Sequence, residues 1–303
     1  MVTVKRLAAL AVLGILPICP WTGRSEVPRD HVFISEDRGA ANSLFAQSAA
    51  QALTRDFDRP AVSFLLLDAR TGALLASRWD DPEKRIPMGS LVKPFTALAY
   101  GQQHEFHYPA HVCMGETSGC WRPSGHGTVD LTSAIANSCN SYFRMLTSGM
   151  NGSQAAPVAR QFGLDEPGPR LHDAALFGLS DPALGNRDPG NQWLISPLHM
   201  ARAYVELARL GNQPGIVDIL AGMAQSARDG TGREAGRALR TPNALVKTGT
   251  APCTHPSHAP GDGFVVALFP ADAPDFLLLV RVHGVPGSRA AATAGEMLHR
   301  IEE

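Results

Sequence analysis

A serine that stands three residues before a lysine constrains this chain more than any other feature. Residues three apart on a helix lie on one face, so Ser90 and Lys93 come within hydrogen-bond reach if a helix begins near Gly89. Pro94 suits such a start, because the amides of a first helical turn have no intrahelical partner. The apolar residues of 95–100 then predict a helix that is buried on nearly all sides.

The lysine of this pair can act as a base. A serine is a weak nucleophile until a base takes its proton, and a lysine does so only if burial or a nearby cation lowers its pKa. The chain uses four lysines and 23 arginines, and Lys93 and Lys247 both stand in short polar motifs. Arginine cannot lose its proton in a protein, whereas lysine can. By itself the pair is a weak signal, since Ser90 and Lys93 are also explained as two helix residues at a common spacing.

Two further motifs follow downstream. Ser138-Cys139-Asn140 comes about 50 residues after Ser90, and Lys247-Thr248-Gly249-Thr250 about 110 residues later. Ser138 and Asn140 are two apart, so on a continuous helix they would point to different sides. A break in the helix at this motif would let both face one cleft. Taken alone, the motif is equally explained as a polar loop between two helices.

Charge and composition exclude one class of partner. The formal net charge is −1, and no basic stripe is present that could neutralise several phosphates, so we expect no nucleic-acid binding. A hydrophobic content of 44% allows a sizeable core.

The first residues have the pattern of an export signal. Lys5 and Arg6 precede an apolar run at 7–18, which is too short to span a bilayer comfortably. We therefore predict a signal peptide or membrane anchor at 1–22, followed by one domain at 23–303.

The rest of the chain predicts an α/β (α+β) fold. Apolar residues recur at helical spacing in 42–57, and a turn separates two strands of a hairpin. The strands expected in the sheet are 61–68, 73–79, 244–250, 264–269 and 276–282. A helix at 290–301 is expected to close the chain. We predict an antiparallel five-stranded sheet flanked by helices, with an inserted, mainly helical lobe at about 101–235 and a cleft between the two.

Histidines and cysteines gather between 102 and 127. His104, His107, His111, Cys113 and Cys120 match no compact zinc-binding spacing, so we expect no metal site. In an oxidising compartment Cys113 and Cys120 could instead close a short disulfide loop, an alternative that the sequence leaves open. Cys139 is expected to be a small buried residue inside its motif.

The three motifs, with the flanking segments, resemble the penicillin-binding transpeptidase domain of the penicilloyl-serine transferase superfamily. The resemblance is greatest to the class B proteins. It rests on the three motifs together with Gly125-His126-Gly127-Thr128-Val129-Asp130-Leu131, Phe162-Gly163-Leu164 and Ile195-Ser196-Pro197.

The resemblance implies a serine D,D-transpeptidase that acts on the D-Ala-D-Ala ends of peptidoglycan stem peptides and is acylated by β-lactams. The implied catalytic residues are Ser90, Lys93, Ser138, Asn140 and Lys247, and the implied substrate-binding residues are Thr248, Gly249 and Thr250. Lacking a side chain, Gly249 would let a substrate backbone lie against its strand. No cofactor or metal is implied. A cell-wall synthesis partner protein is possible, and the expected location is the periplasm or the outer face of the inner membrane of a bacterium.

Other members of the superfamily remain open. A D,D-carboxypeptidase, a β-lactamase and a non-turnover sensor of β-lactams would share these motifs. Against a β-lactamase, the chain lacks the Glu-x-x-Leu-Asn and Tyr-x-Asn motifs, and 165–168 has the composition of a surface turn. Class B proteins usually carry a large N-terminal domain before the hairpin, whereas in this chain only about 30 residues separate the predicted leader from the first predicted helix.

Four further residues are candidates for lining the cleft, although each is equally explained as a core residue or a surface residue. They are Trp121, Arg122, Arg187 and Trp193.

Overall fold

The computed structural model describes residues 35–179, 192–241, 243–253 and 261–303. The chain divides into two units, Met1–Ala40 and Ala41–Glu303. The predicted leader at 1–22 lies outside the described residues, so it stays a prediction. Among the residues that are described, no helix has the length and apolar character needed to cross a membrane.

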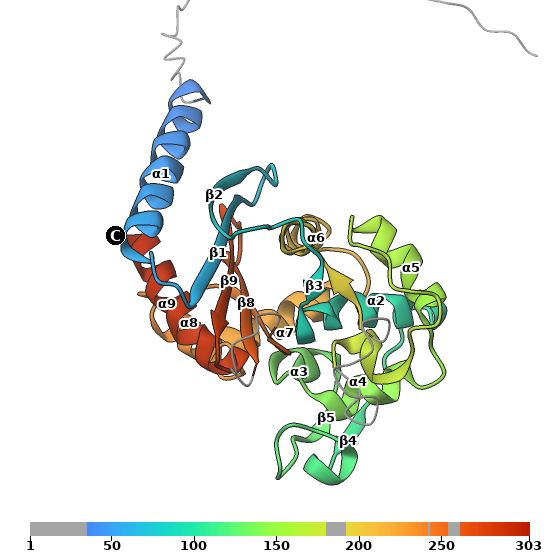
Figure 1. The fold of residues 1–303 in the computed structure, drawn as a ribbon. Coiled ribbons are helices and arrows are strands. Elements are labelled where there is room, and N and C mark those ends of the chain that lie inside the picture. The colour runs from blue at the N-terminus through green and yellow to red at the C-terminus, as the bar shows by residue number, and fades with distance from the viewer. Residues whose placement is uncertain (1–34, 180–191, 242, 254–260) are drawn as a thin grey trace, which may run out of the picture. The chain divides into compact units, whose positions relative to one another are not determined.

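A five-stranded antiparallel sheet forms the framework, as predicted. Its strands are β1 (Val62–Asp68), β2 (Leu74–Arg78), β7 (Leu245–Ala251), β8 (Asp262–Phe269) and β9 (Phe276–His283). Their spatial order is β2-β1-β9-β8-β7, so strands from both ends of the chain meet in the centre (Figure 1). Successive side chains of a strand point to opposite faces, and both faces are apolar here. Leu65 and Leu67 of β1 enter one core, and Phe64 and Leu66 enter the other.

One face of the sheet is covered by helices from both ends of Ala41–Glu303. The helices are α1 (Ser35–Asp56), α8 (Arg233–Arg237) and α9 (Gly287–Glu302). Leu53 of α1 and Ala294 and Leu298 of α9 are fully buried in the core on this face. Residues 290–301 repeat their apolar side chains at helical spacing, and this predicted helix is confirmed.

The opposite face carries the helical part of the fold (Figure 1). Its α-helices are α2 (Lys93–Gln103), α3 (Leu131–Ala136), α4 (Asn140–Thr147), α5 (Gly152–Gln161), α6 (Pro197–Arg209) and α7 (Ile216–Arg228). Two small antiparallel sheets join them, β3 (Ile86–Pro87) with β6 (Leu194–Ile195) and β4 (His111–Cys113) with β5 (Gly127–Val129). The described residues of this part also include the 3-10 turns η1 (Gly89–Val92), η2 (Gly115–Ser118) and η3 (Asp173–Phe177).

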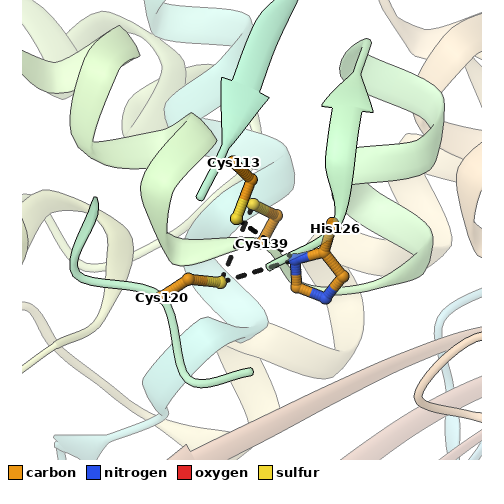
Figure 2. A group of neighbouring side chains, drawn as sticks. All are labelled: Cys113, Cys120, His126 and Cys139. Carbon is orange, nitrogen blue, oxygen red and sulfur yellow. Dashed lines mark hydrogen bonds between the residues drawn. The ribbon is translucent and has the colours of Figure 1, made fainter. Parts of the chain in front are cut away.

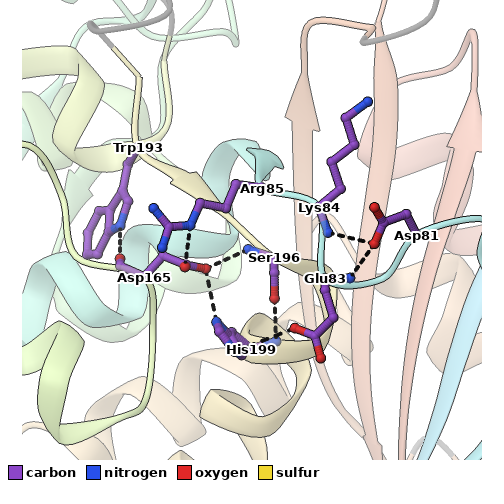
Figure 3. Close-up of polar contacts among 8 residues, drawn as sticks. All are labelled: Asp81, Glu83, Lys84, Arg85, Asp165, Trp193, Ser196 and His199. Atoms are coloured by element: carbon purple, nitrogen blue, oxygen red, sulfur yellow. Dashed lines mark hydrogen bonds and ion pairs between the residues drawn. The ribbon is translucent and has the colours of Figure 1, made fainter.

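Asp165 is a buried anchor, and its interpretation as part of a surface turn was wrong. One carboxylate oxygen accepts the backbone N–H of Ser196 at 2.8 Å and lies 3.0 Å from Nδ1 of His199 (Figure 3). The other lies 2.6 Å from Nε of Arg85. These partners come from the start of α6 and from the segment before β3, so one carboxylate joins three segments. Its neighbour Glu166 is exposed and pairs with Arg160, as a surface residue would.

Candidate active site

Ser90 lies on the tight turn η1 that precedes α2. The helix itself begins at Lys93, four residues after the predicted start near Gly89, with Pro94 in its first turn as expected. Gly89 has a φ of +56°, and a Cβ there would lie 2.2 Å from the carbonyl oxygen of Thr250. Only a glycine lets this turn pack so closely against β7. The buried hydroxyl of Tyr204 donates to the Leu91 carbonyl at 2.8 Å and fixes the turn from the other side.

The second motif lies at a break between α3 and α4, as the two-residue spacing required. Ser138 adopts a φ of +50°, which costs a non-glycine residue conformational energy. Asn140 is the first residue of α4. Lys93 Nζ reaches both residues: it donates to the Ser138 carbonyl at 2.8 Å, to the Ser138 hydroxyl at 3.3 Å and to Asn140 Oδ1 at 2.7 Å. A direct hydrogen bond between Ser90 and Lys93 stays a prediction.

Lys93 is completely buried, and this burial lowers its pKa from 10.5 to about 7. Its Nζ lies over the rings of Phe143 and Phe177, at 5.2 and 5.6 Å from the two centroids. Because a pKa near 7 leaves much of the population neutral at neutral pH, this lysine can accept a proton.

Lys247 reaches the same serine from the sheet. Its Nζ donates to the Ser138 hydroxyl at 3.0 Å and to the Thr248 carbonyl at 2.6 Å. Burial, and then the nearby charge of Lys93, hold the pKa of Lys247 well below its ordinary value. The two lysines come from α2 and β7, which are separated by about half the chain, and their side chains meet at one hydroxyl.

A cavity of about 320 Å³ opens above this cluster. It brings together six of the eight predicted site residues: Ser90, Ser138, Asn140, Thr248, Gly249 and Thr250. Trp121, which the sequence suggested as a lining residue, is 52% exposed at its edge. A larger adjoining cavity of about 740 Å³ shares Trp121 and is lined by Arg122. None of the described lining residues of the smaller cavity carries a carboxylate.

Thr231 is a site residue that sequence reasoning missed. Its hydroxyl is 2.7 Å from the Thr248 hydroxyl, and its backbone N–H donates to the Ala136 carbonyl at 3.1 Å. Thr231 thus ties the end of α3 to β7 at the cavity wall. A lone threonine in the Gly-rich segment after α7 gives no signal of this role in the sequence.

The glycine of the third motif has a packing role that differs from the one expected. A Cβ at Gly249 would lie 2.7 Å from the Met88 carbonyl oxygen and 3.0 Å from Cγ of Leu91. The missing side chain therefore makes room for the turn that carries Ser90, and the expected role of Gly249 beside a substrate stays a prediction.

A family model for the penicillin binding protein transpeptidase domain matches residues 62–301, which include all three motifs. The chain belongs to this family. A curated relative of this transpeptidase domain is the peptidoglycan D,D-transpeptidase PbpA of Mycolicibacterium smegmatis, 28% identical over 217 residues. The match covers 58% of this chain and 43% of PbpA, so the chain spans less than half the length of that relative.

Solved transpeptidase domains share the fold. A D,D-transpeptidase domain of FtsI4 from Legionella pneumophila is 16% identical, with a TM-score of 0.59, over 86% of this chain and 96% of that one. Penicillin-binding protein PBP2 of Helicobacter pylori, solved in complex with MreC, is 17% identical, with a TM-score of 0.64, over 86% of this chain and 62% of that one.

Two of the residues suggested to line the transpeptidase cleft are not found among the described lining residues of the cavity that contains Ser90. Trp193 is buried at 3% exposure, and its Nε1 donates to the Asp165 carbonyl at 2.8 Å (Figure 3). It is therefore a core residue. Arg187 lies outside the described residues.

Proposed function

We propose that this chain is a serine D,D-transpeptidase, which forms an acyl-enzyme on Ser90 with the D-Ala-D-Ala end of a peptidoglycan stem peptide. The observation that carries the proposal is the meeting of two buried lysines at the Ser138 hydroxyl, beside a cavity that Ser90 lines. β-Lactams would acylate the same serine because they mimic the substrate carbonyl.

In the acylation step, Ser90 Oγ attacks the carbonyl carbon of the penultimate D-Ala. Neutral Lys93 takes the hydroxyl proton, since its burial leaves it deprotonated in part of the population. The backbone N–H groups of Ser90 and Thr250 stabilise the oxyanion, a contribution that is worth about a hundredfold or more in rate in comparable enzymes.

The leaving amine receives its proton through Ser138. The Ser138 hydroxyl contacts both lysines, so it can pass a proton from Lys93 to the amine of the terminal D-Ala as the C–N bond breaks. An acceptor amine then attacks the acyl carbon, the new amide forms, and Ser90 regains its proton. Asn140 holds Lys93 in place through its 2.7 Å hydrogen bond.

Substrate binding is assigned to the third motif. Lys247, Thr248 and Thr250 bind the terminal carboxylate. Because β7 is the last strand of its sheet, a peptide can add to its edge with backbone hydrogen bonds. Such an arrangement suits an extended stem peptide.

The composition of the cavity disfavours one kind of β-lactamase, in which a carboxylate activates water on the acyl-enzyme. No carboxylate is present among the described lining residues. A cell-wall synthesis partner is proposed by analogy with the Helicobacter PBP2–MreC complex. Export to the periplasmic side of the membrane is proposed because the substrate is found there.

Intact mass spectrometry with excess benzylpenicillin tests the proposal. The wild type is expected to gain the mass of one penicilloyl group and keep it for hours, and Ser90→Ala is expected to gain none. Absence of an adduct on the wild type would refute the nucleophile. Rapid loss of the adduct with consumption of penicillin would instead identify a β-lactamase.

A further inference from the structure

Three cysteines and one histidine converge at the loop end of the β4–β5 hairpin. Cys113 ends β4, Cys120 follows η2, His126 precedes β5, and Cys139 precedes α4. Figure 2 shows the three sulfurs and Nδ1 of His126 directed at one another. All four atoms lie within 4.8 Å of one another.

The separations fit a tetrahedral zinc ion. Zn–S bonds of about 2.3 Å and Zn–N bonds of about 2.0 Å at tetrahedral angles place two sulfurs about 3.8 Å apart and sulfur and nitrogen about 3.5 Å apart. The Cys120 and Cys139 sulfurs are 3.9 Å apart. Nδ1 of His126 lies 3.5 Å from the sulfurs of both Cys113 and Cys120.

The burial and the oxidation state of the cysteines also favour metal binding. The three cysteines are buried, and all of them are free thiols, so the disulfide between Cys113 and Cys120 that the sequence left open is not formed. A distance of 3.9 Å is also far longer than the bond of about 2.05 Å that a disulfide between Cys120 and Cys139 requires. Thiols are weak hydrogen-bonding groups, so packing three of them around one imidazole nitrogen has little stabilising effect unless they bind something.

We propose that Cys113, Cys120, His126 and Cys139 form a structural zinc site. Soft thiolate ligands with one imidazole select zinc, and four protein ligands leave no open coordination position, as in closed structural sites. The thiols lose their protons on binding, and His126 stays neutral with its proton on Nε2. That nitrogen is buried and has no hydrogen-bond partner among the described residues.

The expectation from sequence that no metal site exists considered Cys113 and Cys120, but it combined them with the wrong histidines. His104, His107 and His111 are not part of the group. His111 instead contacts the Ser141 hydroxyl at 2.6 Å. The spacing was not recognised because the fourth ligand, Cys139, belongs to a catalytic motif and lies 13 residues after His126.

The site would position the catalytic motif. Cys139 stands between Ser138, which is held at a φ of +50°, and Asn140, which holds Lys93. Cys120 precedes Trp121, whose Nε1 donates to the Asn137 carbonyl at 3.1 Å at the cavity edge. A metal bound to both cysteines therefore fastens the hairpin to the motif and fixes one wall of the cavity.

Metal analysis tests the site independently of catalysis. Protein purified without chelator is analysed by inductively coupled plasma mass spectrometry, together with Cys113→Ser, Cys120→Ser and the control His107→Ala. His107 is exposed and belongs to no group of described residues that could hold a metal ion. We expect about one zinc per chain in the wild type and in His107→Ala, and a loss of at least tenfold in the two ligand variants.

Three results would overturn the proposal: zinc retained in Cys113→Ser and Cys120→Ser, zinc lost in His107→Ala, or a metal-free wild type that shows no uptake from added zinc. A Cys120–Cys139 disulfide in the peptide map would also overturn it. Because a ligand variant could misfold, wild-type apoprotein is reconstituted with Co²⁺. Thiolate-to-cobalt charge-transfer and tetrahedral d–d absorption are expected, and an octahedral spectrum without charge transfer would contradict the ligand set.

The metal result and the proposed function fail separately. If the protein binds zinc with the expected stoichiometry but no β-lactam acylates it, the zinc site is supported and the proposed transpeptidase function is refuted. If both hold, removal of zinc is expected to slow acylation at least tenfold and re-addition to restore it. Unchanged acylation of the apoprotein would refute the positioning role.

Discussion

Lys93 and Lys247 donate to the same oxygen, the hydroxyl of Ser138, at 3.3 and 3.0 Å. Both side chains are fully buried, and two positive charges so close together repel strongly where water cannot screen them. The arrangement is favourable only if at least one of them is neutral for much of the time. The Ser138 hydroxyl can accept from one lysine and donate to the other once that one is neutral, and this is the property that a proton relay needs.

Acylation by a β-lactam is expected to depend on the protonation of Lys93. Since burial lowers its pKa to about 7, the neutral base is present above this pH and is lost below it. The second-order rate constant should therefore fall about tenfold per pH unit below the pKa and level off above it. Stopped-flow measurements with a fluorescent penicillin between pH 5 and 9 provide the test. A flat profile would show that Lys93 is not the base.

The same pKa predicts how stability changes with pH. In the unfolded chain the lysine has its ordinary pKa of 10.5, so between pH 7 and that value the unfolded state binds more protons than the folded state. The free energy of unfolding therefore rises with pH across this window as far as Lys93 is concerned. Denaturant unfolding at several pH values measures the slope, and Lys93→Met should make it smaller. An equal slope in the two proteins would contradict the lowered pKa.

Replacement of Lys93 by methionine separates catalysis from stability. The variant keeps the volume of the side chain and removes the base, so acylation should fall at least a hundredfold. The melting temperature should change little, because the removal of a buried amine offsets the loss of its hydrogen bonds to Ser138 and Asn140. Thermal unfolding and penicillin labelling are measured on the same sample. If the melting temperature of the variant is much lower than that of the wild type, its loss of activity says nothing about proton transfer. A stably folded Lys93→Leu variant then tests whether Lys93 is the base.

A methyl group at Gly249 is expected to disturb the nucleophile turn. The added Cβ would meet the Met88 carbonyl at 2.7 Å, so Gly249→Ala should lower both the melting temperature and the acylation rate. Gly168→Ala is the matched control, because a Cβ at that position would meet nothing within 4 Å and its φ is ordinary. The packing explanation would be wrong if Gly249→Ala labelled as fast as the wild type.

Replacement of Asp165 and of its neighbour Glu166 by alanine should have very different effects on the free energy of unfolding. Asp165→Ala leaves the Ser196 amide without its acceptor, so it should cost about 2–4 kcal/mol of unfolding free energy. Glu166→Ala removes only an exposed ion pair with Arg160, worth less than about 1 kcal/mol. Denaturant unfolding of both variants gives the comparison. Equal small losses would mean that the buried carboxylate does not join its segments as described.

The sequence identified the candidate site residues and much of the framework. Local alternation and helical spacing were enough for the hairpin of β1 and β2, the three C-terminal strands and the last helix, because these patterns follow from which side chains face the core. The motifs named Ser90, Ser138 and Lys247 as site residues, since few residue types can carry that chemistry. The two-residue spacing of Ser138 and Asn140 also required the break in the helix that the structure contains.

Only the tertiary structure decided what surrounds these residues. The pKa of Lys93, the burial of Asp165, the contact between Thr231 and Thr248 and the grouping of Cys139 with His126 all depend on segments far apart in the chain. Local sequence patterns report which face of an element is buried, but not which polar groups meet there. Desolvation and hydrogen bonding arise from that meeting, so they are properties of the packed fold and not of the motif.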